Sequence, residues 1–318
     1  MKIVVLDGYA LNPGDLSWEA LKAFGDIAVY DRTSTEAEAI QRIGDAQILL
    51  INKFPVTESL LDTCPTVKMI GVLATGYNVV DCAAARKRNI PVCNVPSYGT
   101  AAVAQFTLAL ILELCHHVGL HDQSVHNKQW QRSPDFCYWL KPQMELDGKT
   151  IGIIGFGRIG RAVGKLAKAF GMKVLAYSPR QYAEGLEIGE YADLDTLLSQ
   201  SDIVSLHCPL FPETKEIINA ASIAKMKDGA MLINTSRGPL INEQDVADAL
   251  DSGKLRAAAV DVVCQEPILD HNPLLKARNC LITPHMAWAP VESRQRLMDC
   301  VVANVQAFLN GTPQNVVN

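Results

Sequence analysis

The feature that most restricts the fold is a glycine-rich turn in the middle of the chain, IGIIGFGRIG, at residues 151–160. The apolar run TIGIIG predicts a β-strand, and RIGRAVGKLAKAF predicts an amphipathic helix directly after it. Four apolar residues of that helix are expected on one face: Ile159, Val163, Leu166 and Phe170. A strand, a glycine-rich turn and a helix in this order are typical of a dinucleotide-binding βαβ unit.

The three glycines of this turn have different expected tasks. Gly155 permits the tight turn, Gly157 lets backbone amides approach a pyrophosphate, and Gly160 lets the helix pack closely on the strand. The N-terminus of the helix would then direct the positive end of its dipole at the phosphates. A strand–turn–helix connection without a ligand is the alternative, and the surrounding pattern disfavours it.

The end of the next predicted strand, MKVLAY, bears on the choice of coenzyme. An acidic residue about 20 residues beyond the glycines commonly binds the adenine ribose hydroxyls. This chain has Ser178, Pro179 and Arg180 there. Ser178 brings no charge that repels a 2′-phosphate, and the Arg180 guanidinium can pair with one. The expected cofactor is therefore NAD or NADP, with NADP accepted; an Arg180 that only points into solvent is the alternative.

Alternating apolar runs and helical patterns predict two α/β domains with parallel sheets. KIVVLD, IAVYD, AQILLIN and VKMIGVLA predict strands of a flavodoxin-like half, and Thr57 is expected to open a helix there. A second series from Lys149 predicts a Rossmann-type sheet. We expect a substrate domain of residues 1–98 plus 289–318, interrupted by an NAD(P)-binding domain of residues 99–288. The helical pattern of residues 291–308 would return the chain to the first domain.

The segment between the two sheets predicts a helix and an arm. Residues 99–117 are apolar almost all round the expected helix, which indicates burial between domains or subunits. Residues 121–144 are expected to be irregular, since they carry Trp130, Pro134, Trp139 and Pro142. Residues 118–146 are therefore expected to form a dimerisation arm, and the protein to be a homodimer.

Composition excludes several classes of partner. The formal charge of −5 over 318 residues argues against nucleic acid, which requires a basic face. No apolar run reaches the ~18 residues of a membrane span, and the N-terminus reads as a strand that ends near Asp7, not as a signal peptide. Nine scattered cysteines with no Cys-x-x-Cys pair and no zinc spacing predict a reducing cytoplasm and no metal site.

Three polar residues follow apolar runs in the second half: Arg237 in INTSRGPL, Glu266 in AAVDVVCQEP and His285 in LITPHMAWAP. The carboxyl ends of parallel strands share one edge, so these residues are expected to converge on a bound dinucleotide. Arg237 would hold a carboxylate, His285 would exchange a proton, and Glu266 would orient the imidazole and stabilise imidazolium. Each residue alone has an ordinary structural explanation, and only the joint pattern predicts hydride chemistry on a 2-oxo or 2-hydroxy acid.

These three blocks resemble the signature blocks of the D-isomer-specific 2-hydroxyacid dehydrogenases. The likeness runs over nearly the whole chain, with GKTIGIIGFGRIG and SDIVSLHCPLFPET as further matching blocks. The resemblance implies a hinge-bending two-domain enzyme, usually a dimer, with Arg237, Glu266 and His285 in the roles above. It also implies a set of cofactor contacts: Thr75, Arg158, Ile159, Cys208, Thr235, Ser236 and Asp261. Ser178 departs from the aspartate of many NAD-using members.

Within the family, the chain is most similar to glycerate dehydrogenases, also called hydroxypyruvate reductases. The features behind this likeness are INKF with Lys53, LATGYNVVD, PDFCYW and PHMAW. It implies that the loop of Ala74, Thr75 and Gly76 holds the substrate carboxylate, and that Lys53 and Trp288 contribute to the pocket, with Trp139 as a further candidate. Reduction of hydroxypyruvate to D-glycerate, and of glyoxylate to glycolate, is expected. One alternative is a dehydrogenase of the same family for another acid, such as lactate, 2-ketoisocaproate or phosphoglycerate. The other is a corepressor-like protein that senses dinucleotides.

Overall fold

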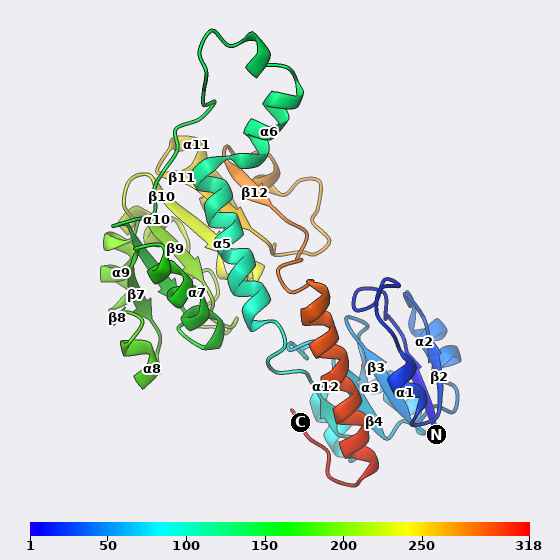
Figure 1. Ribbon diagram of the computed structural model, residues 1–318. Helices are drawn as coiled ribbons and strands as arrows, with labels where there is room; N and C mark the ends of the chain where they lie inside the picture. The colour runs from blue at the N-terminus through cyan, green and yellow to red at the C-terminus, as the bar shows by residue number, and fades with distance from the viewer. The chain divides into compact units, whose positions relative to one another are not determined.

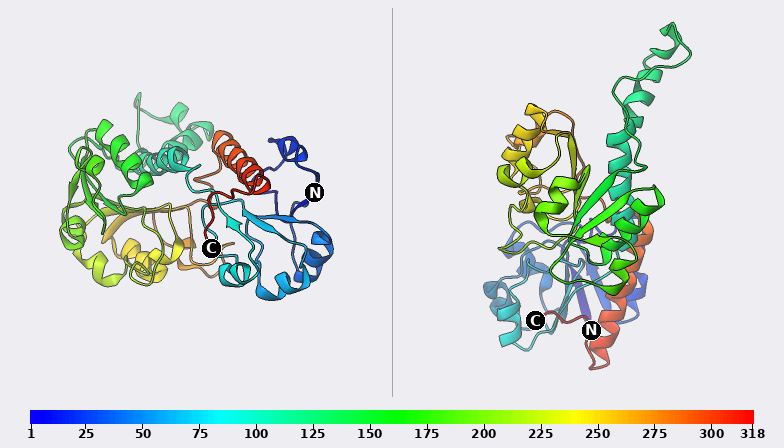
Figure 2. Two further views of the ribbon diagram at one scale, coloured as in Figure 1. Left: turned by 90° about the horizontal axis from the view of Figure 1, so that it is seen from below. Right: turned by 90° about the vertical axis from the view of Figure 1, so that its left-hand side faces the viewer.

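The computed structural model describes residues 1–318, which divide into two compact units. Unit 1 comprises Met1–Gly99 and Trp288–Asn318, and unit 2 comprises Thr100–Ala287. Each unit contains a fully parallel sheet with helices packed on it (Figures 1 and 2). The predicted α/β class with two parallel-sheet domains is therefore confirmed.

The sheet of unit 1 has the order β2–β1–β3–β4–β5, which is the flavodoxin-like order. Its strands are β1 (Lys2–Val5), β2 (Asp26–Val29), β3 (Ile48–Ile51), β4 (Met69–Val72) and β5 (Val92–Cys93). Its helices are α1 (Glu19–Lys22), α2 (Glu36–Ile43), α3 (Glu58–Thr63), α4 (Cys82–Lys87) and α12 (Val291–Leu309). The hydroxyl of Thr57 accepts the N–H of Leu60, so this residue caps α3 as predicted.

Side chains that alternate along β1 build the two cores of unit 1. Ile3 and Val5 pack in one cluster with Leu297 and Val301 of α12. Val4 lies in the other cluster, with residues of α2, α3 and α4. A strand presents successive side chains to opposite faces, so both faces of this sheet must be covered by helices. The C-terminal helix is thus part of the core around the N-terminal strand.

The sheet of unit 2 has the order β12–β11–β10–β9–β6–β7–β8. Its strands are β6 (Thr150–Ile154), β7 (Lys173–Tyr177), β8 (Glu190–Tyr191), β9 (Ile203–Leu206), β10 (Ala230–Asn234), β11 (Leu255–Val260) and β12 (Cys280–Ile282). Its other elements are α5 (Thr100–His116), α6 (Val118–His126), η1 (Trp130–Arg132), α7 (Arg158–Ala169), α8 (Ala183–Leu186), α9 (Leu194–Gln200), α10 (Ala220–Lys225), η2 (Gly238–Leu240), α11 (Glu243–Ser252) and η3 (Pro273–Leu275). Counted from β6, this is the Rossmann order with one extra strand, and the order reverses between β6 and β9, where such folds bind ligands.

The packed face of α7 differs from the predicted one. Leu166 and Phe170 are 38% and 42% exposed, whereas Gly160, Val163, Gly164 and Ala167 are buried. A Cβ added at Gly164 would lie 2.8 Å from a side-chain carbon of Ile188, so the helix packs too closely for bulky residues. Val163 and Ile159 pack against the core as predicted, and the prediction was wrong only for Leu166 and Phe170, because apolar size alone does not reveal a stripe of small residues.

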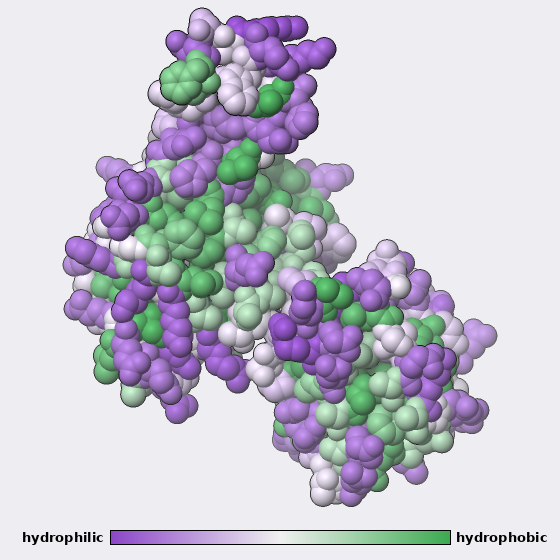
Figure 3. Space-filling model, in the orientation of Figure 1, coloured by the Kyte–Doolittle hydropathy of each residue, from purple (hydrophilic) through white to green (hydrophobic).

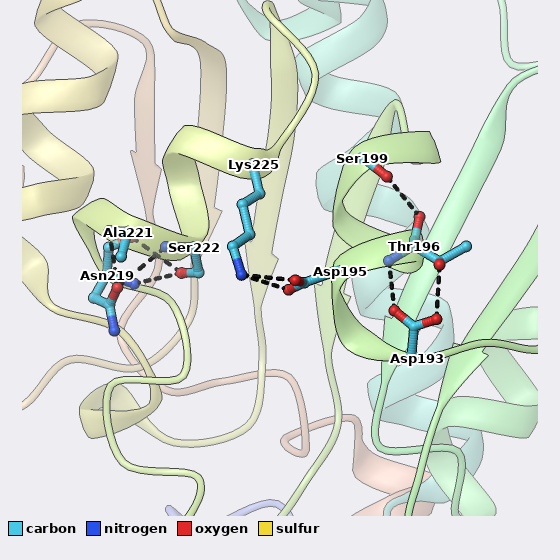
Figure 4. A network of polar contacts seen from close by, with 8 residues as sticks. All are labelled: Asp193, Asp195, Thr196, Ser199, Asn219, Ala221, Ser222 and Lys225. Atoms are coloured by element: carbon cyan, nitrogen blue, oxygen red, sulfur yellow. Dashed lines mark hydrogen bonds and ion pairs between the residues drawn. The ribbon is translucent and has the colours of Figure 1, made fainter.

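On the outer side of unit 2, α9 and α10 are connected by polar contacts (Figure 4). The ammonium of Lys225 lies 2.7 Å and 2.8 Å from the two carboxylate oxygens of Asp195. Asp193 caps α9 through the N–H of Thr196, and Asn219 forms a capping box at α10. Both charges of the ion pair are exposed, so the caps contribute more to these helices than the pair does.

The segment predicted to be irregular, residues 121–144, begins as helix α6, so this prediction was partly wrong. The chain bends by 58° between α5 and α6, at His117, whose φ of 51° is left-handed. Figure 1 shows α6 and the following loop extending beyond the rest of unit 2. The loop is held by the Ser124–Tyr138 hydroxyl contact of 2.6 Å and by the Trp130 indole, which donates to Phe136 O. No single helix has the length and apolar character to cross a membrane; only the bent pair α5 and α6 together passes on length and composition.

Candidate active site and coenzyme cradle

The glycine turn after β6 rests directly on the backbone after β9. Gly155 has φ of +94°, and a Cβ there would lie 2.3 Å from the amide nitrogen of Cys208. A Cβ at Gly160 would lie 2.2 Å from the carbonyl oxygen of Gly155. Both positions therefore require glycine, the first for conformation and space and the second for space alone.

Gly157 differs, because a Cβ there would meet no atom within 4 Å. It is the N-cap residue of α7, and no side chain caps this helix. Open space next to the uncapped amides of a helix N-terminus, at the point where strand order reverses, is the geometry that receives a pyrophosphate. The residues present thus fit a dinucleotide.

The two residues that follow β9 carry no charge at neutral pH. Burial lowers the pKa of His207 to about 3 and raises the pKa of the Cys208 thiol to about 11. The Nε2 atom of His207 lies 2.8 Å from the Ser205 hydroxyl. The Ser236 hydroxyl donates to the carbonyl of Cys208 at 2.7 Å, and the Thr235 hydroxyl lies 3.0 Å from that of Thr107. The predicted cofactor residues Cys208, Thr235 and Ser236 therefore lie on adjoining strand ends.

Two guanidinium groups gather at the end of β7, where the coenzyme specificity residues were predicted. Arg180 lies 4.9 Å from the ring centroid of Tyr182, and Arg161 of α7 lies 4.3 Å from the same centroid. Arg161 also donates to the carbonyl of Phe156 at 3.2 Å. Sequence reasoning selected Ser178 and Arg180 but missed Arg161, because only the fold brings the first turns of α7 beside the end of β7.

His285 and Glu266 form a direct pair. The Nδ1 atom of His285 lies 2.7 Å from Oε2 of Glu266, with the two side chains 31% and 37% exposed. A carboxylate only accepts, so Nδ1 of His285 carries the proton of this contact. The backbone N–H of Val263 donates to Oε1 of Glu266 at 3.3 Å.

Asp261 holds the loop that presents His285. Its buried carboxylate accepts the Thr283 hydroxyl at 2.6 Å and the backbone N–H groups of Met286 and Ala287 at 2.9 Å and 2.8 Å. The N–H of His285 donates to the Asp261 carbonyl, and the φ of His285 is 53°. The predicted cofactor contact of Asp261 stays a prediction, while the carboxylate is engaged in shaping this loop.

Arg237 lies in a turn that packs against the loop of Glu266. The buried amide of Asn234, at the end of β10, donates to the Arg237 carbonyl at 2.8 Å and accepts the N–H of Ser236 at 3.0 Å. A Cβ added at Gly238 would lie 2.0 Å from the carbonyl carbon of Val263. The exposed guanidinium of Arg237 donates to the Ser236 carbonyl at 2.7 Å.

The predicted substrate residues Lys53, Ala74, Thr75, Gly76 and Trp288 all belong to unit 1. Asp7, at the end of β1, accepts the backbone N–H groups of Asn52, Lys53 and Phe54 at 2.6–2.8 Å. Asn94, after β5, donates to the Thr75 carbonyl at 2.8 Å. Sequence reasoning missed both residues, whose only signal is a polar side chain at a strand end.

The two aromatic candidates lie in different units. Trp288 meets Tyr98 edge to face, with centroids 6.3 Å apart, in unit 1. Trp139 belongs to the arm of unit 2 and is 67% exposed. Trp288 is half-buried, and the ring it meets, Tyr98, packs against the core of unit 1, so this contact gives Trp288 a packing role.

A Rossmann-type sheet with an open glycine turn, next to a histidine–glutamate pair at strand ends, defines a dinucleotide-dependent oxidoreductase. Residues 108–287 match the family described as D-isomer specific 2-hydroxyacid dehydrogenase, NAD binding domain. The chain is 59% identical to a hydroxypyruvate reductase of Blautia hydrogenotrophica, over 100% of both chains. It is 42% identical to a glycerate dehydrogenase of Methylorubrum extorquens, over 99% of this chain and 98% of the relative. The chain belongs to the D-isomer-specific 2-hydroxyacid dehydrogenases.

The fold is shared with a solved acyclic imino acid reductase in complex with NADPH and D-Arg. The TM-score is 0.85 at 29% identity, with all of both chains covered. The family match confirms an NAD-binding domain within the predicted coenzyme-binding half of the chain. The protein is an NAD(P)-dependent oxidoreductase that acts on the CH–OH group of 2-hydroxy acids, as predicted.

Proposed function

We propose that the protein reduces hydroxypyruvate to D-glycerate, and glyoxylate to glycolate. The observation that carries this proposal is the 59% identity, over both full lengths, to a protein named hydroxypyruvate reductase. The 42% identity to a glycerate dehydrogenase points to the same pair of acids, since that name describes the reverse direction. The His285–Glu266 pair supplies the proton carrier that such a reduction needs.

The proposed roles follow from the chemistry of the side chains. The residues proposed to bind the substrate are Arg237 in unit 2 and Lys53, Ala74, Thr75, Gly76 and Trp288 in unit 1. A guanidinium, an ammonium and backbone N–H groups are all donors that a carboxylate accepts from. A bound reduced nicotinamide supplies the hydride for C2. His285 donates its Nε2 proton to the forming alkoxide, and the Glu266 carboxylate stabilises imidazolium before that transfer. The Arg237 guanidinium offsets the negative charge that develops on the substrate oxygen.

The proposed coenzyme contacts are distributed over several strand ends: Thr75, Gly155, Gly157, Arg158, Ile159, Gly160, Ser178, Arg180, Cys208, Thr235, Ser236 and Asp261. A cytoplasmic location is part of the proposal, supported by nine free cysteines. No nucleic acid or membrane partner is expected at a formal charge of −5.

The substrate is tested by initial rates with hydroxypyruvate, glyoxylate, pyruvate and 2-ketoisocaproate. We expect kcat/KM for hydroxypyruvate to exceed that for pyruvate by at least about tenfold, because the extra hydroxyl adds a polar contact worth about 1.4 kcal/mol or more. Faster reduction of pyruvate or 2-ketoisocaproate would assign the site to a different acid. Coenzyme binding without turnover of any of them would favour a sensing role.

The pair is tested by the pH dependence of the reductive reaction in Glu266→Gln. Reduction requires imidazolium, which the neutral amide stabilises less than the carboxylate does. The alkaline limb of kcat/KM is therefore expected to move to lower pH by about one unit or more. His285→Ala gives the lower limit of activity: its kcat/KM is expected to fall about 10²–10⁴-fold below that of the parent, while coenzyme affinity is retained. An unmoved limb in Glu266→Gln would remove Glu266 from this role.

NADP(H) is the proposed preferred coenzyme, with its 2′-phosphate held at the end of β7. Ser178 there carries no charge, and Arg161 and Arg180 lie on the ring of Tyr182. Two cations at one ring attract a phosphate dianion, and each charge-assisted hydrogen bond contributes about 1.5–3 kcal/mol.

Dissociation constants for NADPH and NADH, measured by calorimetry, test this site. Arg180→Ala is expected to weaken NADPH about 10- to 100-fold, as 1.5–3 kcal/mol implies, while NADH changes little. Adding Arg161→Ala should weaken NADPH further. Lys165→Ala, an exposed cation on the same helix, serves as the control for general charge. Equal weakening of both coenzymes would place the arginines elsewhere.

The arm of residues 118–146 is proposed to contact a second copy of the chain in a homodimer. Phe136 and Trp139 are 89% and 67% exposed, and Val118 and Trp130 add further apolar surface. Figure 3 shows apolar side chains among the hydrophilic ones of the arm and a broader apolar area below it, over α5. Exposed apolar side chains on a segment that extends beyond the rest of its unit are typical of a protein–protein interface.

Sedimentation of the double variant Phe136→Ser and Trp139→Ser tests the dimer. At micromolar concentration the parent is expected to sediment as a dimer and the variant as a monomer, because the variant loses two large apolar contacts. Leu186→Ser removes an equally exposed apolar residue outside the arm and should leave association unchanged. A dimeric double variant, or a monomeric parent, would contradict the proposal.

A further inference from the structure

One carboxylate outside the proposed catalytic residues bridges the loop that carries Glu266. Glu243 is the first residue of α11 and is half-buried. Its Oε1 accepts the backbone N–H of Cys264 at 2.7 Å, and its Oε2 accepts the side-chain amide of Asn272 at 3.0 Å. The two ends of residues 264–272, which include Glu266, are therefore held by one side chain.

The Asn272 end of this loop is a firm attachment. Asn272 is buried, and its Oδ1 accepts the N–H of Leu274 at 3.0 Å, which caps η3. Its own N–H donates to the carbonyl of Leu269 at 2.9 Å. The side-chain amide thus uses both its oxygen and its nitrogen, and the Glu243 oxygen is the partner that ties it to α11.

The Cys264 end of this loop packs against the turn that carries Arg237 and Gly238. A Cβ added at Gly238 would lie 2.4 Å from the Cys264 nitrogen and 2.0 Å from the carbonyl carbon of Val263, so the Arg237 turn touches this peptide. The Val263 N–H in turn donates to Oε1 of Glu266 at 3.3 Å. Burial and the nearby Glu243 charge raise the pKa of the Cys264 thiol to about 11, so this thiol adds no charge of its own.

We propose that Glu243 is a positioning residue, which fixes Glu266 beside His285 by holding the Cys264 N–H and the Asn272 amide together. This inference rests on the proposed roles of Glu266 and His285. Without the Glu243 carboxylate, a buried amide and a backbone N–H lose their acceptor, and the loop must rearrange to satisfy them. The loop then no longer holds Glu266 at 2.7 Å from His285.

A plainer role for Glu243 is that of an acidic residue in the first turn of α11, where it favours the helix dipole. That role predicts a loss of thermal stability and nothing else. The two roles separate in the pH profile, because only a displaced Glu266 changes how well imidazolium is stabilised.

The experiment compares Glu243→Ala and Glu243→Gln with Asp245→Asn. Asp245 lies in the same helical turn, but its carboxylate accepts the N–H of Ala220, the first residue of α10. We expect Glu243→Ala to move the alkaline limb of reductive kcat/KM to lower pH and to lower kcat about tenfold, while the coenzyme dissociation constant stays within about twofold, since the glycine turn is untouched. Glu243→Gln retains one acceptor and should lie between Ala and the parent. Asp245→Asn should leave the profile in place.

A double variant closes the test. If Glu243 acts through Glu266, adding Glu243→Ala to Glu266→Gln should not move the limb further. An unmoved limb in Glu243→Ala, with a moved one in Glu266→Gln, overturns the positioning role alone. An unmoved limb in both overturns the role of Glu266 and the inference with it. Additive shifts show that Glu243 acts independently of Glu266, which also overturns the inference; coenzyme binding by Glu243→Gln verifies that the fold is intact.

Discussion

Every strand of both sheets runs parallel, so no strand is joined to its neighbour by a hairpin. The loops at the carboxyl edge of each sheet, which carry the proposed site residues, therefore lack the hydrogen bonds that a hairpin turn provides. Where their backbone N–H and C=O groups are buried, they need partners other than a neighbouring strand, and side chains can supply them. In this protein an Asn or Asp within two residues of the end of a strand does so. Asp7 binds the loop of Lys53, Asn94 the loop of Thr75, Asn234 the turn of Arg237, and Asp261 the loop of His285.

The strongest case is Asp261, because it supports an unfavourable backbone conformation. A left-handed φ at a non-glycine residue such as His285 costs on the order of 1–3 kcal/mol. Asp261 accepts one hydroxyl and two N–H groups from the same loop, and hydrogen bonds to a charged group contribute about 1.5–3 kcal/mol each. The carboxylate therefore outweighs the strain, and the imidazole is held in the direction of Glu266 by the backbone as well as by the Nδ1 contact.

Patterns within one element were enough to predict much of this architecture. The run TIGIIG and the glycines predicted β6 and its turn, and Arg237, Glu266 and His285 were selected because each follows an apolar run. What failed depends on contacts between elements. Leu166 and Phe170 face outward because α7 packs through small residues. The two-residue strands β5 and β8 are too short to produce a pattern. Arg161 and Glu243 act, in our proposals, across the fold, and a sequence does not reveal which distant group a charged residue meets.

The pKa values of His207 and Cys208 distinguish these two buried groups from the proposed acid–base pair of His285 and Glu266. His207 and Cys208 lie next to the glycine turn, yet burial keeps the first deprotonated and the second protonated throughout the neutral range. Neither group changes charge between pH 5 and pH 9, because the pKa of His207 is about 3 and the pKa of Cys208 is about 11. These two groups therefore contribute no pH dependence of turnover in that range, and the proposed acid–base pair of His285 and Glu266 lies at other strand ends of the same unit. The buried side chains of His207 and Cys208 thus bring no charge to the glycine turn, where the proposed coenzyme pyrophosphate binds.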